Sequence, residues 1–432
     1  MLKKIGKSIL GTVQVTLNRL AHSPWVSFAL IFSLSFAIHM QTLMKIPSRY
    51  LVPNPEWEMI SIAISLMKTG QFADPYMIPT GPTAHLPPIY PAIFTLVYRI
   101  FGLTSTAGYV SMSLIILAAS IVDGMLPWLS KKLGLGGQAG VIGGFAGAFF
   151  MELPGHGEYL TAIVLGFCLV AFTQRWSRGK ISKSSSLFFG LGIGISFHLQ
   201  PALLPVILGC MAFELWWSKN HQKWVFSLFI ALGIFLACLP WAWRNYTTFN
   251  AIFFIRSNLG LELRMGNHEG AYAAMDVMDK HEEHIHPRVH FTEARKLREI
   301  GEIAYMRDAM DDALEWIKAN PDEFMRLTGL RVLHIWFGPL HDPKAAAQTS
   351  ALTLLALLGL IFAWKKFSVT QRAILLIPLV TFPLIYYLVA YMPRYRVPID
   401  WILFMLAGSA VWHWIGKGSK ENEHVQNQRL QP

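Results

Sequence analysis

The sequence predicts an all-α polytopic membrane protein, with about 10 to 12 transmembrane helices and a helical loop domain on the outer face. Three observations predict this fold class. Only 15% of the 432 residues are charged and 53% are hydrophobic, whereas a soluble domain has about 25% charged residues. Ten apolar runs approach the length that crosses about 30 Å of hydrocarbon. Lysines and arginines gather between these runs, as the positive-inside rule describes.

The predicted spans contain almost no charged residues: 25–44, 107–129, 136–153, 159–174, 186–198, 202–217, 223–243, 347–364, 373–391 and 397–414. Two further apolar segments, 88–101 and 327–340, are near 14 residues long, so they are expected to be interfacial or re-entrant. No signal peptide is expected, because the first span is long and no small-residue cleavage site follows it.

Charge placement predicts the topology. If neither short segment crosses the membrane, 18 of the 25 bases outside residues 244–331 fall on one side, so both termini are expected in the cytoplasm. If segment 88–101 crosses the membrane, the spans in the middle of the bundle have the opposite orientation. The two outer loops keep their side in either case, provided that segment 327–340 does not cross. The expected regions are a cytoplasmic segment (1–24), a transmembrane region (25–243) with the first outer loop (45–101), an outer, periplasmic helical loop domain (244–346), C-terminal transmembrane helices (347–415) and a cytoplasmic tail (416–432).

The second outer region differs in composition from the rest of the chain. Residues 244–331 hold 15 of the 26 acidic and 12 of the 37 basic residues, so they are expected to be exposed to water. Amphipathic periodicity predicts surface helices over 291–310 and 311–318. The formal charge of +11 therefore reflects membrane topology, and nucleic acid is not expected as a partner.

Several common sites are not expected. The three cysteines lie in apolar runs without metal or redox spacing: Cys168, Cys210 and Cys238. The spaced glycines lie inside apolar spans, so they predict close helix packing and no nucleotide site: Gly190, Gly192, Gly194 and those from Gly136 to Gly147. One tract is rich in potential metal ligands: His281, His284, His286 and His290. It lacks the HExxH arrangement, and a solvated loop explains it more economically.

The first outer loop carries the clearest site signal. Apolar residues at helical spacing predict an amphipathic helix over 56–68 on the membrane surface, ended by Gly70. Glu58 lies in its first turn, where the helix dipole stabilises a carboxylate. Alternatively, Glu56 and Glu58 are only favourable N-terminal residues. The loop then takes a rigid, non-helical path set by prolines: Pro79, Pro82, Pro87, Pro88 and Pro91.

Three stretches resemble the GT-C superfamily of membrane glycosyltransferases, which includes the protein O-mannosyltransferases and the lipid A aminoarabinose transferase. They are GPTAHLPPIYP (81–91), PWAWRNYTTFNAIFFIRSNLGLELRMGN (240–267) and MPRYRVPID (392–400). With the helix layout, the resemblance covers roughly residues 20–415. It implies a GT-C like fold and an enzyme that moves a hexose or pentose from a polyprenyl phosphate to a lipid, glycan or protein acceptor. The transfer inverts the anomeric centre at the outer face of a bacterial inner membrane.

The resemblance also implies which residues act on the acceptor. A carboxylate must take the proton of the acceptor hydroxyl; Glu58 matches the family's position best, and Glu56 is the near alternative. Glu158 resembles a second acid of some relatives, which holds a divalent cation or orients the acceptor. A favourable charge at a helix N-terminus is the other explanation of Glu158. His85 and Asp74 are further candidates for orienting the acceptor or a cation.

Cations must neutralise the phosphate that leaves. Arg394 and Arg396, on either side of Tyr395, are held by a proline-flanked turn and could bind a phosphate bidentately. The alternative is a pair of interface anchors that reach lipid headgroups. Arg244 and Arg256 are weaker candidates for the same phosphate.

Two other functions stay open at this point. A transporter or flippase of a lipid-linked substrate is also multispanning, and Asp123 lies mid-span where a proton relay needs an acid. However, the two halves of the chain show no internal repeat of the kind common in transporters. A polyprenyl-dependent glycan polymerase or ligase is the second alternative. An acid and prolines directly after the first span favour the glycosyltransferase.

Overall fold

The fold is all-helical, as predicted. The computed structural model describes residues 2–150, 157–177, 181–280 and 285–429, with a helix content of 78%. These residues contain no β-strand and only two isolated bridges, Ala73 to Pro82 and Ala274 to Tyr391. The class predicted from composition is therefore confirmed.

Seven helical segments among the described residues are long and apolar enough to cross a membrane. They are α2 (Pro24–Met44), α5 (Ser105–Leu133), α7 (Glu158–Ser177), α10 (Lys223–Phe249), α16 (Pro343–Trp364), α17 (Val369–Thr381) with η3 (Phe382–Tyr387), and η4 (Pro393–Arg396) with α18 (Val397–Arg429). Three other predicted spans form shorter helices: α6 (Gly137–Phe150), α8 (Lys183–Phe197) and α9 (Leu204–Trp217), the last preceded by η2 (Pro201–Leu203). The chain is therefore a helical membrane protein.

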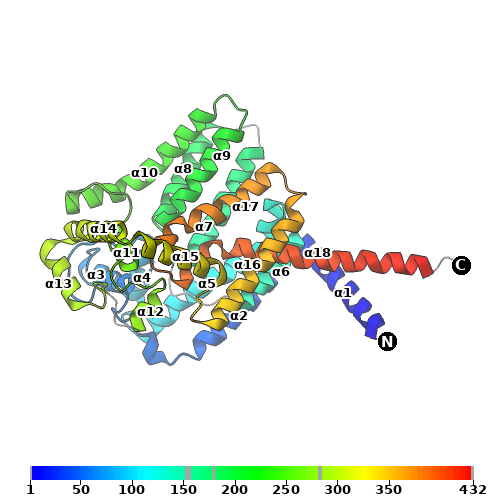
Figure 1. Ribbon diagram of the computed structural model, residues 1–432, viewed down its shortest axis with the longest axis horizontal. Coiled ribbons are helices and arrows are strands. Elements are labelled where there is room, and N and C mark those ends of the chain that lie inside the picture. Colours follow the sequence, from blue (N-terminus) through cyan, green and yellow to red (C-terminus); the bar gives the residue numbers. More distant parts are fainter. Residues whose placement is uncertain (1, 151–156, 178–180, 281–284, 430–432) are drawn as a thin grey trace.

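The two predicted outer segments supply the remaining helices, apart from the N-terminal α1 (Leu2–His22). The first segment forms η1 (Ser48–Leu51), α3 (Glu58–Thr69) and α4 (Ile89–Phe101). The second forms α11 (Leu259–Gly266), α12 (Met275–Lys280), α13 (Phe291–Ile300), α14 (Glu302–Ala319) and α15 (Pro321–Phe337). Figure 1 shows α3, α11, α13 and α14 gathered at one end of the molecule.

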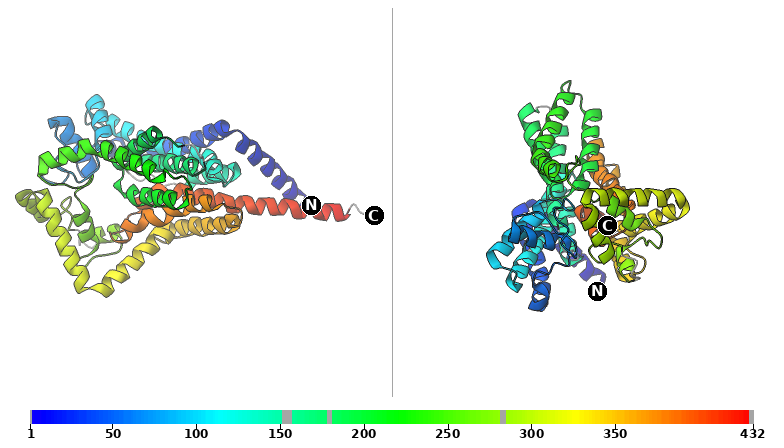
Figure 2. Two further views of the ribbon diagram at one scale, coloured as in Figure 1. Left: turned by 90° about the horizontal axis from the view of Figure 1, so that it is seen from above. Right: turned by 90° about the vertical axis from the view of Figure 1, so that its left-hand side faces the viewer.

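The two ends of the chain lie together at the other end of the molecule. α1 and the last part of α18 extend away from the bundle on the side opposite α3 and α13, as two views show (Figures 1 and 2). The charge pattern predicts that both termini share one side, and this arrangement agrees with it. That this side faces the cytoplasm stays a prediction.

α3 holds the most prominent predicted acid at its N-terminus. The helix begins at Glu58, two residues after the predicted start, and ends at Gly70, whose φ of 73° favours glycine. Its buried face includes Met59, Ile62 and Ala63. That face packs against α4, where Thr95 Oγ1 donates a hydrogen bond to the Ala63 carbonyl at 3.2 Å. The backbone that carries Glu58 is therefore fixed by tertiary contacts.

Other predicted boundaries also differ from the structure. Gly301, with a φ of 83°, separates α13 from α14, so the predicted break between residues 310 and 311 is wrong. α10 continues to Phe249 instead of ending at 243, and Asn250 stops it with a φ of 50°. The apolar segment 327–340 is largely the second half of α15, which starts at a proline.

Glycines bring the spanning helices into close contact, as predicted for most of them. A Cβ on Gly140 would overlap the Leu126 carbonyl group of α5. Gly190 and Gly194 lie in the same way against α10. Gly192 differs, because nothing lies within 4 Å of a Cβ built there. It has no packing role in the structure.

Candidate functional site

Two cavities meet beside the N-terminus of α3. The larger has a volume of about 1020 Å³ and reaches residues of the candidate spans, such as Ile115 of α5 and Phe404 and Val411 of α18. The smaller has a volume of about 490 Å³ and lies between α3, the start of α7, η2 and the second outer segment. Both volumes suit small-molecule ligands, whose pockets span about 300–1,000 Å³. Four residues line both cavities: Trp57, Met59, Met392 and Arg394.

Glu58 lines the smaller cavity in the first turn of α3. Its Oε1 lies 3.4 Å from Arg288 Nε and 3.7 Å from His286 Nε2. The Arg288 guanidinium also lies over Trp57, 4.9 Å from the ring centroid. Burial raises the pKa of Glu58, and the charge of Arg288 opposes part of that rise. A partly buried carboxylate that faces a cavity suits proton transfer.

His85 is buried beside the same cavity. Its Nδ1 lies 3.0 Å from Tyr76 Oη, and its ring centroid is 5.8 Å from that of His286. Burial, with the nearby charge of Arg256, holds the pKa of His85 well below its usual value. The imidazole is therefore neutral, and it can accept a hydrogen bond or bind a cation.

Glu58, His85 and His286 form a candidate cation site. One ligand atom from each lies within 4.8 Å of the others, in the only such group of three found among the described residues. Two imidazoles and one carboxylate are a donor set that Zn²⁺ takes in catalytic sites.

The histidine-rich tract is therefore more than a solvated loop. His286 is buried, with 6% of its surface exposed, and lies against Glu58. His290 is exposed and caps α13 by accepting a hydrogen bond from Glu293 N. His281 and His284 lie outside the described residues. The expectation of solvation fails at His286 because this residue and Arg288 lie against Glu58 of α3.

Glu302 fixes the loop that carries His85. This buried residue at the start of α14 accepts hydrogen bonds from Thr83 Oγ1 (2.5 Å), Ala84 N (2.8 Å) and Ser257 Oγ (2.6 Å). All three donors would lose this partner if the carboxylate were removed. Glu302 therefore joins the first outer segment to the second.

Replacing Glu302 with alanine should lower the free energy of unfolding by about 1–3 kcal/mol, because buried donors are left unpaired. Chemical denaturation in detergent micelles measures this change. Glu299→Ala is the matched control: its carboxylate is exposed and pairs with Arg295 at 2.8 Å, so it should change stability by less than about 0.5 kcal/mol. Equal stability of the two variants would contradict the role of Glu302.

Two predicted phosphate ligands, Arg244 and Arg256, hold the same loop. Arg244 donates to the carbonyl oxygens of Thr83 (2.8 Å) and Phe72 (3.0 Å) and lines neither cavity. The structure thus gives Arg244 a structural role in place of the predicted one. Arg256 donates to the His85 carbonyl oxygen at 2.8 Å and lines the smaller cavity.

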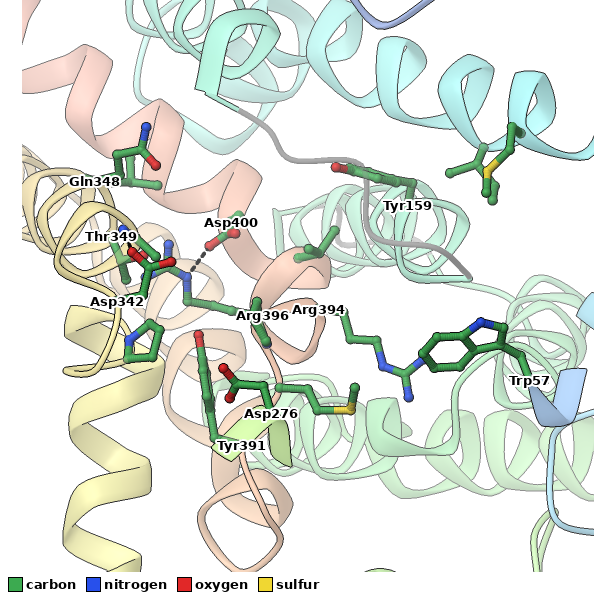
Figure 3. Close-up of a pocket in the computed structure, with 18 of the residues that line it drawn as sticks. Trp57, Tyr159, Asp276, Asp342, Gln348, Thr349, Tyr391, Arg394, Arg396 and Asp400 are labelled. Atoms are coloured by element: carbon green, nitrogen blue, oxygen red, sulfur yellow. Dashed lines mark hydrogen bonds and ion pairs between the residues drawn. The ribbon is translucent and has the colours of Figure 1, made fainter. Parts of the chain in front are cut away.

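Arg394 lies where the two cavities meet. Its Nε is 3.7 Å from Glu158 Oε1, and Figure 3 shows its side chain extending toward Trp57. Glu158, at the start of α7, is buried, and its Oε2 has no hydrogen-bond partner among the described residues. Both residues line the smaller cavity, so the pair keeps polar atoms available to a ligand there.

Arg396 lines the larger cavity together with Arg394, but its guanidinium is held by other residues. Its Nε lies 2.5 Å from Asp400 Oδ1, and it donates to the Ile335 carbonyl oxygen and to Thr353 Oγ1. In Figure 3 the two arginine side chains extend in opposite directions. The predicted bidentate pair is corrected to a single candidate, Arg394, because η4 turns the two side chains apart.

The other predicted residues are less central. Glu56 is exposed at the larger cavity and accepts a hydrogen bond from Asn54 at 2.5 Å. Tyr395 lines the smaller cavity and stacks on Tyr386, with ring centroids 4.3 Å apart.

Two acids lie away from both cavities. Asp74 accepts hydrogen bonds from Thr80 N (2.9 Å) and Gly81 N (2.8 Å), so it shapes the turn instead of orienting a ligand. Asp123 accepts a hydrogen bond from Ser35 Oγ at 2.7 Å inside the helix bundle. Neither acid lines either of these two cavities.

No protein-family model matches this chain, and a search of the curated proteins finds no significant relative. The resemblance to GT-C enzymes therefore stays a prediction. A function has to be proposed from the site geometry together with the sequence motifs.

Sequence reasoning did not place Arg288 or Glu302 at the site, and it named His286 only as one of four potential metal ligands in a tract expected to be solvated. His286 and Arg288 come from a loop far from Glu58 in sequence, and their only signal was the density of histidines and basic residues in HEEHIHPRVH. Glu302 gave no signal, because it is one of 15 acids in a segment expected to be solvated. Its burial depends on the loop at residues 83–84 docking against α14.

Proposed function

We propose that this chain is an inverting glycosyltransferase with a GT-C like fold, which moves a sugar from a polyprenyl phosphate to an acceptor at the outer membrane face. One observation carries the proposal: Glu58 lines the smaller of two cavities that share Arg394, and the larger cavity extends along candidate spanning helices. The sequence motifs at 81–91 and 392–400 support it, because both contribute lining residues. In this proposal α6, α8 and α9 also cross the membrane, and both termini face the cytoplasm.

The donor occupies the larger cavity. Its apolar walls, formed by residues such as Ile115, Leu352 and Phe404, suit an isoprenoid chain, since apolar surface is favourably removed from water there. The donor phosphate lies at Arg394, whose guanidinium can form two parallel hydrogen bonds to it. The sugar then lies at the junction of the two cavities.

The reaction is a single displacement. The acceptor hydroxyl oxygen bonds to the anomeric carbon as the bond between that carbon and the phosphate oxygen breaks. The phosphate leaves with the electron pair and is stabilised by Arg394, while the hydroxyl proton passes to Glu58. Attack from the face opposite the phosphate inverts the anomeric centre. Glu158 supports Arg394 and offers its unpartnered oxygen to an acceptor hydroxyl.

A divalent cation fits the same site. Glu58, His85 and His286 would hold it, and the buried, neutral His85 is already in the protonation state of a ligand. When bound, the cation supplies positive charge beside the acceptor hydroxyl.

We expect purified protein to bind about one Zn²⁺ or similar ion per chain, since the site supplies three protein ligands. Plasma mass spectrometry measures the metal content directly. His286→Ala should lower the bound metal at least tenfold, while His290→Ala, in an exposed cap of α13, should leave it unchanged. Metal-free protein with full transferase activity would remove the cation from the proposal.

The test of the function is transfer in proteoliposomes. A panel of polyprenyl phosphates that carry radiolabelled hexoses or pentoses is supplied with an envelope extract as acceptor. One donor should lose its sugar with release of free polyprenyl phosphate. If the protein releases no polyprenyl phosphate from any donor, the glycosyltransferase proposal fails.

A further inference from the structure

We propose that Arg331 is a positioning residue for sugar transfer: its buried guanidinium holds the connection between η3 and η4 and thereby sets where Arg394 lies at the two cavities. The inference rests on the proposed function, and it concerns a residue that lines neither cavity. It follows from the contacts that Arg331 makes with two distant segments of the chain.

Arg331 lies on α15 and is fully buried. Its Nη1 donates hydrogen bonds to Asn267 Oδ1 and to the Leu388 carbonyl oxygen, both at 3.2 Å, and its Nη2 donates to the Gly266 carbonyl oxygen. The acceptors belong to the end of α11 and to the residue that follows η3. One guanidinium therefore joins α15, α11 and the η3–η4 connection.

The acceptors of Arg331 are all neutral oxygens, and its Nε has no hydrogen-bond partner among the described residues. Burial lowers the pKa of Arg331 to about 10, so the side chain is charged at neutral pH. A buried charge without a partner of opposite sign is unfavourable, and an apolar side chain would avoid that cost. What an apolar side chain would not supply is the rigid fork of donors that binds both segments.

The end of α11 packs directly on the η3–η4 connection. The buried Asn267 donates from Nδ2 to the Leu388 carbonyl oxygen at 2.8 Å, so that oxygen accepts hydrogen bonds from Asn267 and Arg331 together. Gly266 leaves no room for a side chain, because a Cβ there would lie 2.8 Å from Ala390 N. The position of the connection therefore depends on both Arg331 and Gly266.

The connection leads to Arg394 and is held at a second point. Tyr391 N donates to the Ala273 carbonyl oxygen at 2.8 Å, and Met275 N donates to the Tyr391 carbonyl oxygen at 3.0 Å. η4, which carries Arg394, begins two residues later, and α15 contacts both η3 and η4. Loss of the point at Leu388 should therefore shift the backbone that presents Arg394.

Two substitutions test this role. Arg331→Met removes the donors at similar length, and Gly266→Ala leaves Arg331 in place but displaces the backbone at Ala390. Each should lower kcat by about 10- to 100-fold, because a displacement of about 1 Å at a positioning group can cost that much. Arg331→Lys should recover part of the loss, since it keeps a donor without the fork. If Arg331→Met does not fold, Gly266→Ala carries the same test.

The matched controls lie on the same helix, α15. Arg326 is exposed and pairs with Glu323, and Gly329 is exposed with nothing within 4 Å of a Cβ built there. Arg326→Met and Gly329→Ala should therefore leave kcat unchanged.

A double-mutant cycle separates positioning from a general loss of structure. Rates are measured in proteoliposomes with the labelled polyprenyl phosphate sugar that the protein consumes, and they are expressed per folded protein. In an Arg394→Ala background, Arg331→Met and Gly266→Ala should each change kcat less than about threefold, because the group that they position is already absent. A merely structural role would instead multiply the two losses.

Hydrogen–deuterium exchange reads the same effect without turnover. Amides of residues 388–396 should exchange at least tenfold faster in Arg331→Met and Gly266→Ala than in the wild-type protein. Amides of α14 should exchange at the wild-type rate in both variants.

The outcomes separate this inference from the function beneath it. Losses that multiply in the Arg394→Ala background, or wild-type exchange of residues 388–396 in the variants, overturn the role of Arg331 and leave the glycosyltransferase proposal intact. If the wild-type protein releases no polyprenyl phosphate from any donor, the proposed function fails, and the role of Arg331 in transfer fails with it.

Discussion

Replacing Glu58 with glutamine is expected to lower the rate of sugar transfer by about 100- to 10,000-fold, the usual contribution of a general base. Glutamine keeps the shape of the side chain but cannot take the acceptor proton. The protein should still fold, because the glutamine oxygen can still accept hydrogen bonds from Arg288 and His286. Initial rates in proteoliposomes measure the effect, and thermal unfolding in detergent verifies the fold.

Glu56→Gln provides the matched comparison. The two glutamates are close in sequence, yet Glu56 is exposed outside α3 and lines only the larger cavity. Its substitution should change the rate less than about threefold, consistent with a surface change of about 0.5 kcal/mol. If Glu56→Gln abolishes transfer while Glu58→Gln is active, the assignment of the base is reversed.

Replacing Arg394 with alanine should lower kcat by about 100- to 1,000-fold, the cost of removing one group that stabilises developing charge. The expected reason is loss of an arginine that lines both cavities. Arg394→Lys should recover part of this loss, because lysine keeps the charge without the planar fork. Steady-state kinetics with labelled donor separate kcat from KM.

Arg396→Ala distinguishes a phosphate ligand from a structural arginine. Its guanidinium pairs with Asp400 and two other partners, with 8% of the side chain exposed. Removing it leaves Asp400 unpaired, so the expected loss is about 3–5 kcal/mol of stability, with kcat retained by the folded fraction. A folded Arg396→Ala protein with kcat as low as that of Arg394→Ala would restore the predicted bidentate pair.

The sequence predicted the helices of the site better than the contacts between them. Apolar spacing and Gly70 were sufficient to place Glu58 in the first turn of a short helix. The motif around His85 was predicted to follow a non-helical path through Pro91; the segment is irregular up to Pro88, but Pro91 lies inside α4. Periodicity and turn chemistry are properties of neighbouring residues, so one sequence is enough to read them.

The side-chain contacts of the site could not be predicted, because they form between segments that are distant in the chain. Arg394 and Arg396 are two residues apart, yet one lies at the junction of the cavities and the other pairs with Asp400. Arg244, which sequence reasoning assigned to phosphate, binds backbone carbonyls of the first outer segment. The direction of each side chain follows from the helices packed around it, and a local pattern does not contain that information.

By itself, the sequence determined that this protein is a helical membrane protein, because scarce charge and long apolar runs act residue by residue. It also limited the acids that can serve as a base to a few. Only the tertiary structure decided that His286 and Arg288 contact Glu58, that Glu302 fixes the loop beside it, and that two cavities meet at Arg394. The physical reason is that such contacts form between distant segments, brought together when their apolar faces are buried.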